Sequence, residues 1–430
     1  MSAPAPTPAR RVTDRPETSR LVSLLTGKEI VVCCGSGGVG KTSVAAALAL
    51  AAAEQRDGKV LVLTVDPARR LATALGIEGI GNLERQVDPE LLRAAGIDAR
   101  AEVWAAMLDT KQSWDALVLR HAPDDQTAYR ILHNRLYDNL TARFVQSHDY
   151  IAIERLFELH NEGKYDLIIV DTPPSRNAVD FLDAPSRMRE FFGGRLLRWL
   201  TLPYRVGGGR GARVISVASR PFYQIADRLI GSRFLEEIAN FFLNFQSMYD
   251  GFVTRANAVE QLLRDRRTTF AVVTTLEAAP LHEAEEFFTE LAARRLQLGA
   301  LVCNRVLPDY FVAPDALAAA RDLDARADAL GDEIAANDGG SVTELAASAD
   351  VRRVLHTVAT SFRDFSLVGA QEHQLRADLA RVPDVTVTVP MRTADVSDVE
   401  GLAWIARRML GRTEGDGDSA TDATATGTPA

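Results

Sequence analysis

The chain has 430 residues, of which 47% are hydrophobic and 25% are charged, and its formal net charge is −9. This length suits one large α/β domain or roughly two to three smaller ones, and the apolar content is ample for a sizeable core. Broad nucleic-acid binding needs a basic surface, so the acidic balance argues against it and leaves open only a local basic patch. We therefore expect no nucleic-acid partner.

The two ends of the chain and its cysteines bear on location. Residues 1–20 and 412–430 lack an apolar pattern, which predicts two disordered tails. The N-terminus has no signal-peptide core, and no apolar run approaches the ~20 residues of a membrane span. Cys33, Cys34 and Cys303 have no C-x-x-C spacing, which favours buried thiols over a zinc or redox site. We expect a cytoplasmic location, with peripheral attachment to a membrane left open.

The most informative stretch is residues 29–53. A short apolar run, typical of a β-strand, meets the glycine-rich turn GSGGVGKT at 35–42, and an Ala- and Leu-rich helical pattern follows. This arrangement fits the P-loop template G-x-x-x-x-G-K-[ST] in its required context of strand, loop and helix. Glycines let backbone amides turn toward phosphate oxygens, and the helix directs its positive N-terminus at the same anion. The turn therefore predicts nucleotide binding.

Each part of the P-loop has an expected role. Lys41 is expected to reach the β- and γ-phosphates, and the Thr42 hydroxyl to ligate Mg²⁺. An ordinary glycine-rich turn is the structural alternative, but it gives no reason for a Gly-Lys-Thr triplet. The motif alone does not choose among kinase, GTPase, motor and transport ATPase. The residues expected to contact the nucleotide here are Gly37, Gly38, Val39, Gly40, Lys41, Thr42 and Ser43.

Two later strand-like runs end in an aspartate. KVLVLTV at 59–65 precedes Asp66, and YDLIIV at 165–170 precedes Asp171. The carboxyl ends of strands in an open α/β sheet face the ligand crevice. Asp66 is thus a candidate for positioning the attacking water or the Mg²⁺ shell, or else it caps a helix in an Asp-Pro turn. Asp171 fits a Walker-B aspartate that holds Mg²⁺ directly or through water, although turn chemistry also accounts for it.

The rest of the chain alternates between strands and helices. This order predicts one α/β P-loop domain over residues 21–411, with a doubly wound, mostly parallel sheet and helical insertions. The insertion at 177–266 is rich in aromatic residues. Its apolar faces either bury against the core or form a switchable surface for a partner or client. Other expected elements are a helical insertion at about 85–160, strands at 269–275, 299–303 and 385–389, and a helical pair at 314–380.

Together these motifs resemble the ArsA family of arsenite-pump and tail-anchored-protein-targeting ATPases, within the deviant-Walker-A, MinD-like class of P-loop ATPases. The resemblance covers most of residues 29–411 and begins with the P-loop itself. TVDPA at 64–68 resembles the family's switch I, and DTPPS at 171–175 resembles its switch II. The stretch 148–175 resembles most closely the actinobacterial branch of anion-transporting ATPases.

The resemblance includes two residues expected to contact the nucleobase, and it implies a mechanism. Asn304 after a β-run and Pro390 on the last strand resemble the pair that contacts adenine in the family. The implied activity is ATP hydrolysis with Mg²⁺, in which Asp66 orients the attacking water and Asp171 supports the Mg²⁺ bound by Thr42. The family resemblance further implies a dimer that closes around nucleotide and moves its switches to act on a protein client or membrane partner.

The chain also departs from the family pattern. Ser36 stands where the family's signature lysine reaches across the dimer, Asn177 replaces the usual switch II histidine, and the zinc- and metalloid-binding cysteines have no counterparts. Arsenite transport is therefore not expected. One hypothesis is a heterodimer with a paralogue that retains the lysine, and the alternative to an active ATPase is a regulatory subunit that binds ATP and hydrolyses it weakly. A kinase or GTPase is disfavoured because no N-K-x-D guanine motif is present.

Overall fold

The computed structural model describes most of the chain between Glu17 and Arg412. Its described ranges are 17–65, 70–77, 81–134, 136–137, 145–172, 183–184, 186–187, 190, 238, 241–244, 248–337, 344–379, 383–392 and 394–412. Residues 1–16 and 413–430, which hold most of the two predicted tails, lie outside these ranges.

The described strands form one eight-stranded sheet in the order β3-β4-β2-β5-β1-β6-β7-β8. All neighbours in the sheet pair in parallel except β3 and β4, which pair antiparallel. This arrangement confirms the predicted mostly parallel sheet. The strands are β1 Ile30–Cys34, β2 Lys59–Thr64, β3 Arg85–Gln86, β4 Glu102–Met107, β5 Leu167–Asp171, β6 Thr268–Thr274, β7 Leu298–Val306 and β8 Val385–Pro390.

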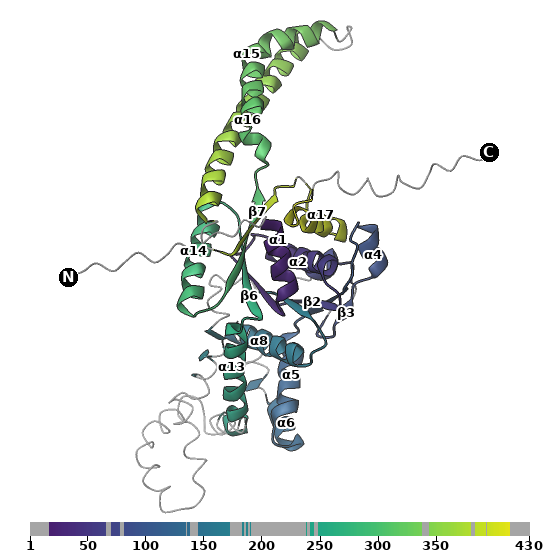
Figure 1. Cartoon of the computed structure of the whole chain (residues 1–430), viewed down its shortest axis with the longest axis vertical. Helices are drawn as coiled ribbons and strands as arrows, with labels where there is room; N and C mark the ends of the chain where they lie inside the picture. The colour runs from purple at the N-terminus through teal and green to yellow at the C-terminus, as the bar shows by residue number, and fades with distance from the viewer. Residues whose placement is uncertain are drawn as a thin grey trace, which may run out of the picture.

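Helices cover both faces of the sheet, as a doubly wound fold requires (Figure 1). The reason is visible in β1, where Ile30 and Val32 point into one apolar core and Val31 and Cys33 into the other. One core is closed by α1 Glu17–Gly27, α2 Lys41–Gln55, α3 Arg70–Ala74, α4 Pro89–Ala94 and α17 Val399–Met409. The other is closed by α5 Thr110–His121, α6 Asp125–Leu132, α8 Val145–Asn161, α13 Tyr249–Arg264 and α14 Ala278–Ala293.

The register of the central strands sets up the site. On β1, Cys33 pairs with Asp171 of β5, and on β2, Thr64 pairs with the same aspartate. Because the strands are parallel, their carboxyl ends meet at one edge, where the P-loop leaves β1. Asp171 is therefore brought beside the first turn of α2, although 129 residues separate it from Thr42.

Two of the predictions need correction. The region 85–160, predicted to be mostly helical, also contains a strand, because Glu102–Met107 forms β4 beside β2. Val103 and Ala105 of β4 are almost fully buried, so burial within the sheet outweighs the helical spacing of the apolar residues there. Helix α1 also begins at Glu17, inside the predicted tail, and buries apolar residues one turn apart against the sheet.

A long helical hairpin confirms the helical pair expected at 314–380. It consists of α15 Pro314–Asn337 and α16 Glu344–Leu379, and it projects from the body of the molecule between β7 and β8 (Figure 1). A short 3₁₀ helix, η1 Asp309–Val312, leads into it. The base of the hairpin is tied to the body because the Leu307 amide donates to the Glu372 carboxylate at 2.8 Å.

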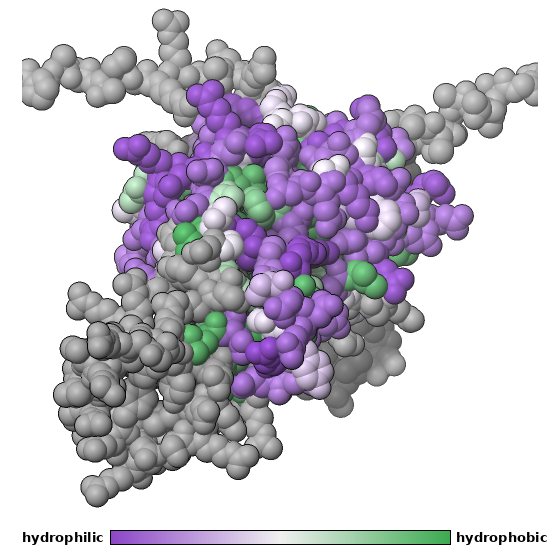
Figure 2. All heavy atoms as spheres, turned by 90° about the horizontal axis from the view of Figure 1, so that it is seen from below, coloured by the Kyte–Doolittle hydropathy of each residue, from purple (hydrophilic) through white to green (hydrophobic). Residues whose placement is uncertain are grey.

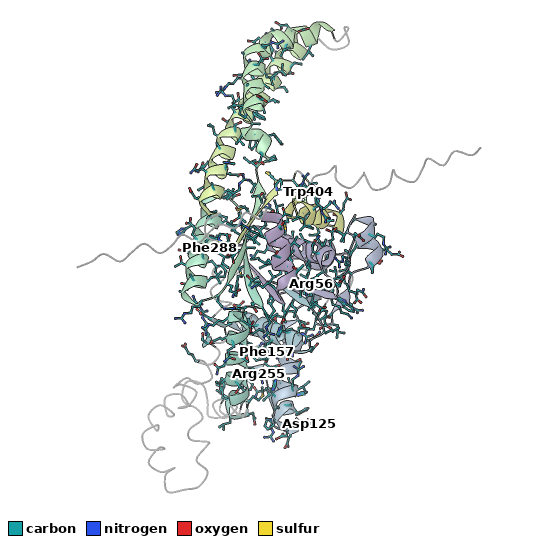
Figure 3. All side chains as sticks on the ribbon, in the orientation of Figure 1. Arg56, Asp125, Phe157, Arg255, Phe288 and Trp404 are labelled. Carbon is teal, nitrogen blue, oxygen red and sulfur yellow. The ribbon has the colours of Figure 1, made fainter. Side chains whose placement is uncertain are left out.

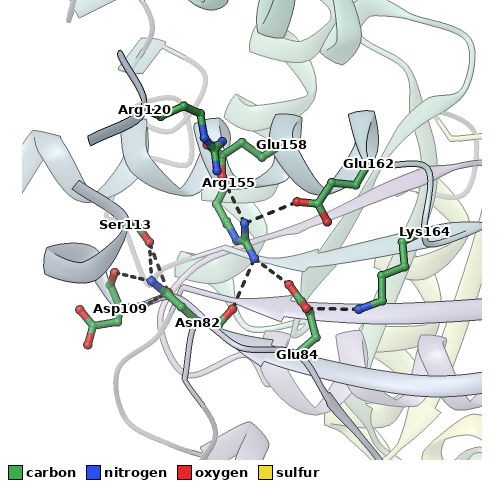
Figure 4. Close-up of polar contacts among 9 residues, drawn as sticks. All are labelled: Asn82, Glu84, Asp109, Ser113, Arg120, Arg155, Glu158, Glu162 and Lys164. Atoms are coloured by element: carbon green, nitrogen blue, oxygen red, sulfur yellow. Dashed lines mark hydrogen bonds and ion pairs between the residues drawn. The ribbon is translucent and has the colours of Figure 1, made fainter. Parts of the chain in front are cut away.

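A charged cluster fixes the loop before β3 to α8 (Figure 4). The Arg155 guanidinium lies 2.6 Å from the Glu84 carboxylate and 3.2 Å from that of Glu158. Lys164 contacts Glu84 from the other side at 3.4 Å. Both charges of the Arg155–Glu84 pair are largely shielded, so this contact is better protected from solvent than an ordinary surface pair.

The surface seen from below is mainly hydrophilic where it is described, with small, separate apolar patches (Figure 2). Within the described residues, no helix has the length and apolar character needed to cross a bilayer.

Candidate nucleotide-binding site

The glycine-rich turn between β1 and α2 is pressed against the ends of two neighbouring strands. A Cβ on Gly35 would lie 2.1 Å from the Val273 carbonyl oxygen, and one on Gly40 would lie 2.4 Å from the Asn304 amide nitrogen. Gly40, at φ 91°, also has a backbone that favours glycine. Gly40 is also the N-cap residue of α2 and has no side chain with which to cap the helix, so the first amides of α2 can bind an anion.

Lys41, the first residue of α2, has its ammonium at this turn. Its side chain is largely buried, and Nζ donates to the Ser36 carbonyl oxygen at 2.8 Å. Lys41 also lines the cavity above the loop. A buried ammonium beside several backbone amides gives the turn a positive field that suits a polyphosphate.

Asp171 organises two hydroxyl groups at the end of β5. The Thr42 hydroxyl donates to Asp171 Oδ2 at 2.7 Å, and the Thr64 hydroxyl donates to the same oxygen at 2.8 Å. Asp171 is fully buried, whereas Thr42 lines the cavity. Because the Thr42 hydroxyl donates its hydrogen bond to Asp171, the lone pairs of the Thr42 oxygen are available to a cation. These groups fit Mg²⁺, with Thr42 as the ligand and Asp171 as the residue that orients it.

Asn304 connects β7 to the P-loop. Its amide nitrogen donates to the Val39 carbonyl oxygen at 2.7 Å, and the residue is only 6% exposed. The pairing of β7 with β8 is irregular between Cys303 and Val306, and Arg305 within that irregularity has φ 57°. This local distortion aims the polar end of β7 at the cavity rather than continuing the ladder.

Pro390 completes the same end of the cavity. It is the last residue of β8 and pairs with Val306, and the Met391 amide donates back to the Val306 carbonyl at 2.7 Å. A proline at the end of an edge strand leaves no ladder hydrogen bond unmade. Asn304 and Pro390, which are 86 positions apart in the sequence, therefore both line the cavity, and their contact with the base stays a prediction.

The cavity has a volume of about 1090 Å³ and joins these two groups of residues. Its lining includes Gly38, Gly40, Lys41, Thr42 and Ser43 of the P-loop and α2. It also includes residues that the sequence does not predict, namely Arg70, Arg305, Met391, Arg392 and Trp404. Arg305 is predictable because it follows Asn304 directly. Trp404 lies on an amphipathic helix, where the sequence pattern predicts that an aromatic residue belongs to the apolar core.

Trp404 is held by cations at the cavity wall. The guanidinium carbon of Arg392 lies 5.6 Å from the Trp404 ring centroid, and that of Arg408 lies 5.4 Å from it. Such cation–π contacts restrain an aromatic side chain that is otherwise only partly buried. Figure 3 shows Trp404 on α17, on the opposite side of the sheet from the Arg255 region.

Ser36 occupies a tight position in the loop. It is 9% exposed, and within the described part of the chain its hydroxyl has no hydrogen-bond partner. A serine hydroxyl carries no formal charge, so this position adds no positive charge to the site. Its neighbours Cys33 and Cys34 are fully buried, and burial raises the pKa of Cys34 to about 12 and that of Cys33 well above its usual value. These thiols are structural, as the sequence predicts.

One predicted site residue, Asp66, lies outside the described residues. The same holds for Pro67 and Ala68 of the motif that resembles switch I and for residues 173–175 of the motif that resembles switch II. Thr172, the last described residue before switch II, lines the cavity and donates from its hydroxyl to the Cys33 carbonyl at 2.8 Å. Most of the 177–266 insertion also lies outside, and within it α13 is helical as expected.

The parallel sheet, the strand–loop–helix turn at its centre, and the aspartate at the end of a neighbouring strand define a P-loop NTPase fold. Comparison with known families then identifies the chain more closely. The model of the anion-transporting ATPase family, ArsA ATPase, matches residues 28–327, which is more than half of the chain. The chain therefore belongs to the ArsA ATPase family.

Individual relatives are more distant. The chain is 30% identical over 280 residues to the uncharacterized protein SCO2128 of Streptomyces coelicolor, and this match covers 64% of the chain and 62% of that protein. It is 24% identical over 305 residues to ATPase GET3 of Malassezia globosa, covering 68% and 78% of the two chains. It is 27% identical over 283 residues to ATPase ASNA1 homolog 1 of Paramecium tetraurelia, covering 64% and 74%.

Proposed function

We propose that the chain is a Mg²⁺-dependent ATPase whose nucleotide state switches its conformation for a protein client or membrane partner. The observation that carries this proposal is the single cavity that joins Lys41 and Thr42 at one end to Asn304 and Pro390 at the other. Its length and chemistry suit a nucleoside triphosphate, with phosphates on the α2 N-terminus and the base against β7 and β8. The relatives named as ATPases support the same reaction.

The chemistry assigns a role to each group. Lys41 and the loop amides would hold the β- and γ-phosphates and stabilise charge that develops on them. Mg²⁺ bound at Thr42 would neutralise the same oxygens, and Asp171 would keep the Thr42 hydroxyl oriented toward it. We assign Asp66 the orientation of the attacking water, since it comes two residues after Thr64, the last residue of β2, and Thr64 pairs with Asp171.

We further propose that the working form is a dimer in the cytoplasm, with contact to a membrane only through a partner. Within the described residues, all three cysteines are free thiols and buried, which suits a reducing compartment. The net charge of −9 argues against nucleic acid as the partner.

The decisive experiment measures phosphate release from ATP by the purified chain with and without Mg²⁺. Lys41→Ala is the inactive reference, and Lys111→Ala on the exposed face of α5 is the matched lysine control. Turnover that needs Mg²⁺, survives in Lys111→Ala and is lost in Lys41→Ala supports the proposal. Turnover equal in Lys41→Ala and wild type would overturn it, and phosphate transfer to an acceptor instead of water would indicate a kinase.

A second candidate function rests on Ser36. The chain would bind ATP and hydrolyse it only when a lysine-bearing paralogue supplies the charge that this position lacks. Ser36→Lys tests this idea, because an added cation at a developing charge accelerates such reactions by roughly 10²–10³-fold. Wild-type chain that binds ATP without turnover, together with an active Ser36→Lys variant, favours the heterodimer. A wild-type homodimer with full turnover and no paralogue present excludes it.

A further inference from the structure

The α15–α16 hairpin presents a feature that nucleotide binding does not use. The family match ends at residue 327, within α15, so α16 lies wholly beyond it. The hairpin extends away from the sheet and the nucleotide cavity (Figure 1). In Figure 3 its side chains project on both sides along its length. This geometry leaves much of α16 accessible to another molecule.

One face of α16 is already occupied by α15 and η1. Ala359 is fully buried, and Ser366, one heptad later, donates from its hydroxyl to the Phe311 carbonyl at 2.6 Å. Gly369, three residues further on, faces η1 so closely that a Cβ would lie 3.1 Å from the Val312 side chain. The positions Leu355, Ala359, Phe362, Ser366 and Gly369 repeat at alternating spacings of four and three, which is the pattern of a coiled-coil seam.

A second seam runs beside the first, and each of its residues directly precedes a residue of the first seam in the sequence. It consists of Val354, Val358, Ser361, Phe365 and Val368, with the same alternating spacing of four and three. Its four apolar members are large, yet each is about half exposed, at 55%, 52%, 47% and 49%. At a rise of 1.5 Å per residue this seam is ~21 Å long. An apolar coiled-coil seam of that length on a projecting helix is suited to packing against another helix.

We propose that this second seam binds the same seam of a second copy of the chain, with the two α16 helices antiparallel. The charges beside the seam favour this occupant. Arg353 and Asp364 lie on the same flank, each next to a seam residue, and both are exposed. When Val354 faces the partner's Phe365, Arg353 comes opposite the partner's Asp364, and symmetry makes this contact twice. A parallel pairing would set this flank against the opposite flank of the partner helix, so Arg353 would not meet Asp364.

In the same antiparallel register, a larger side chain of one helix faces a smaller side chain of the other. Val354 packs against the larger Phe365, and Val358 packs against Ser361, so the small serine lies near the two-fold axis. No charged residue falls between Val354 and Val368 on the seam itself. The contact therefore buries apolar surface at its centre and places opposite charges at its edge, as stable interfaces do. It joins two copies through the hairpins, away from the nucleotide cavity.

Self-association of the full chain without nucleotide, followed by sedimentation equilibrium, tests the proposal. Val358→Glu places a charge on the seam close to its own symmetry mate and is expected to weaken association at least about tenfold. Leu367→Glu is the matched control, because Leu367 is 73% exposed on α16 but lies off the seam. Helicity at 222 nm verifies that both variants remain folded. A wild type that stays monomeric up to about 100 μM would overturn the proposal, as would equal effects of the two variants.

A charge exchange tests the antiparallel register itself. Arg353→Asp and Asp364→Arg should each weaken association by roughly three- to tenfold, since each creates two like-charged contacts at an exposed edge. The double variant Arg353→Asp/Asp364→Arg should regain the wild-type affinity. Single variants without effect, or a double variant weaker than either single one, would exclude this register. Association that persists unchanged in Val358→Glu would place the contact elsewhere and refute the seam.

Discussion

The Thr42 hydroxyl lies 2.7 Å from Asp171 Oδ2, and this one contact joins the first turn of α2 to the end of β5. The same oxygen accepts a second hydrogen bond, from the Thr64 hydroxyl, at 2.8 Å. A fully buried carboxylate that accepts two hydroxyl hydrogen bonds is held in one orientation, and it holds Thr42 in one orientation in turn. Under the proposed function, Asp171 would act on a bound cation through Thr42, because only Thr42 of this pair lines the cavity.

The first prediction concerns this pair. Asp171→Asn keeps an oxygen for the hydroxyl groups but removes the charge, so the Mg²⁺ affinity of the nucleotide complex should fall about 10–100-fold. Nucleotide binding in the absence of Mg²⁺ should change little, since Lys41 and the loop amides remain. Titration calorimetry with and without EDTA measures both quantities. Asp166→Asn at the other end of β5 is the control, and an equal loss of Mg²⁺ affinity in both variants would contradict the assignment.

The second prediction concerns Asn304, which should separate base recognition from phosphate recognition. Asn304→Ala removes the donor to the Val39 carbonyl, and leaving a buried carbonyl unpaired costs about 1–3 kcal/mol of unfolding free energy. ATP affinity should fall clearly more than affinity for inorganic tripolyphosphate, which has no base to bind. Asn82→Ala, which breaks another partly buried hydrogen-bond cluster, should cost stability without this difference. Equal losses for both ligands would argue against Asn304 as a base contact.

Much of the central sheet follows from the sequence because its strands carry a local signal. Runs such as those before Asp66 and Asp171 are apolar on both faces, and only a parallel sheet buried on both sides accommodates them. The sequence therefore predicts that Asp171 and Thr42 lie near one another. By contrast, β4 depends on its neighbours: Glu102–Met107 becomes a strand only because β2 offers a paired edge. A single segment carries no information about that partner.

The remote end of the cavity shows a second limit of sequence reasoning. The family resemblance predicts Asn304 and Pro390 at the nucleotide site, but it predicts neither Trp404 nor Arg392, which line the same cavity. Their position depends on how α17 packs over α2, which involves residues about 350 positions apart. The apolar pattern alone also does not predict the exposed seam of α16. Two adjacent heptad seams are present, and the pattern does not determine which of them packs against α15.

The third prediction concerns a buried ion pair in the helical layer below the sheet, where Figure 3 shows Arg255 on α13. Its Nε lies 2.6 Å from a Glu154 carboxylate oxygen, with Glu154 only 2% exposed, and Tyr150 donates to the other oxygen at 3.0 Å. Glu154→Ala removes the carboxylate that pairs with the buried guanidinium and should lower the free energy of unfolding by about 3–5 kcal/mol. Tyr150→Phe should lower it by about 1 kcal/mol.

Urea unfolding followed by circular dichroism measures these losses. The control is the exposed pair of Arg326 and Asp322, whose side chains are 60% and 65% exposed. Asp322→Ala should change the free energy of unfolding by less than about 0.5 kcal/mol. A loss in Glu154→Ala no larger than that in Asp322→Ala would show that the Glu154–Arg255 contact does not stabilise α8 against α13.

The last prediction uses two histidines whose pKa values shift in opposite directions. Burial, with the nearby charges of Arg255 and Arg120, lowers the pKa of His121 from 6.5 to about 4. The hydrogen bond to Asp324, at 2.9 Å, raises the pKa of His356 above 6.5. The fold therefore disfavours the protonated form of His121 and favours that of His356. Linkage then requires opposite slopes of stability with pH for the two groups.

For His121, the contribution to stability is complete above pH 6.5 and is lost as the pH falls toward about 4. Wild type should therefore lose more stability than His121→Gln over that interval. For His356, the contribution is complete below pH 6.5 and is lost as the pH rises through the folded-state pKa, so the His356→Gln deficit should be largest in acid. Denaturant unfolding of wild type, His121→Gln and His356→Gln, from about pH 4 to above the folded-state pKa of His356, measures both differences in unfolding free energy. The difference in unfolding free energy between wild type and variant should rise with pH for His121→Gln and fall with pH for His356→Gln. Two differences that change with pH in the same direction would contradict one of the two pKa shifts.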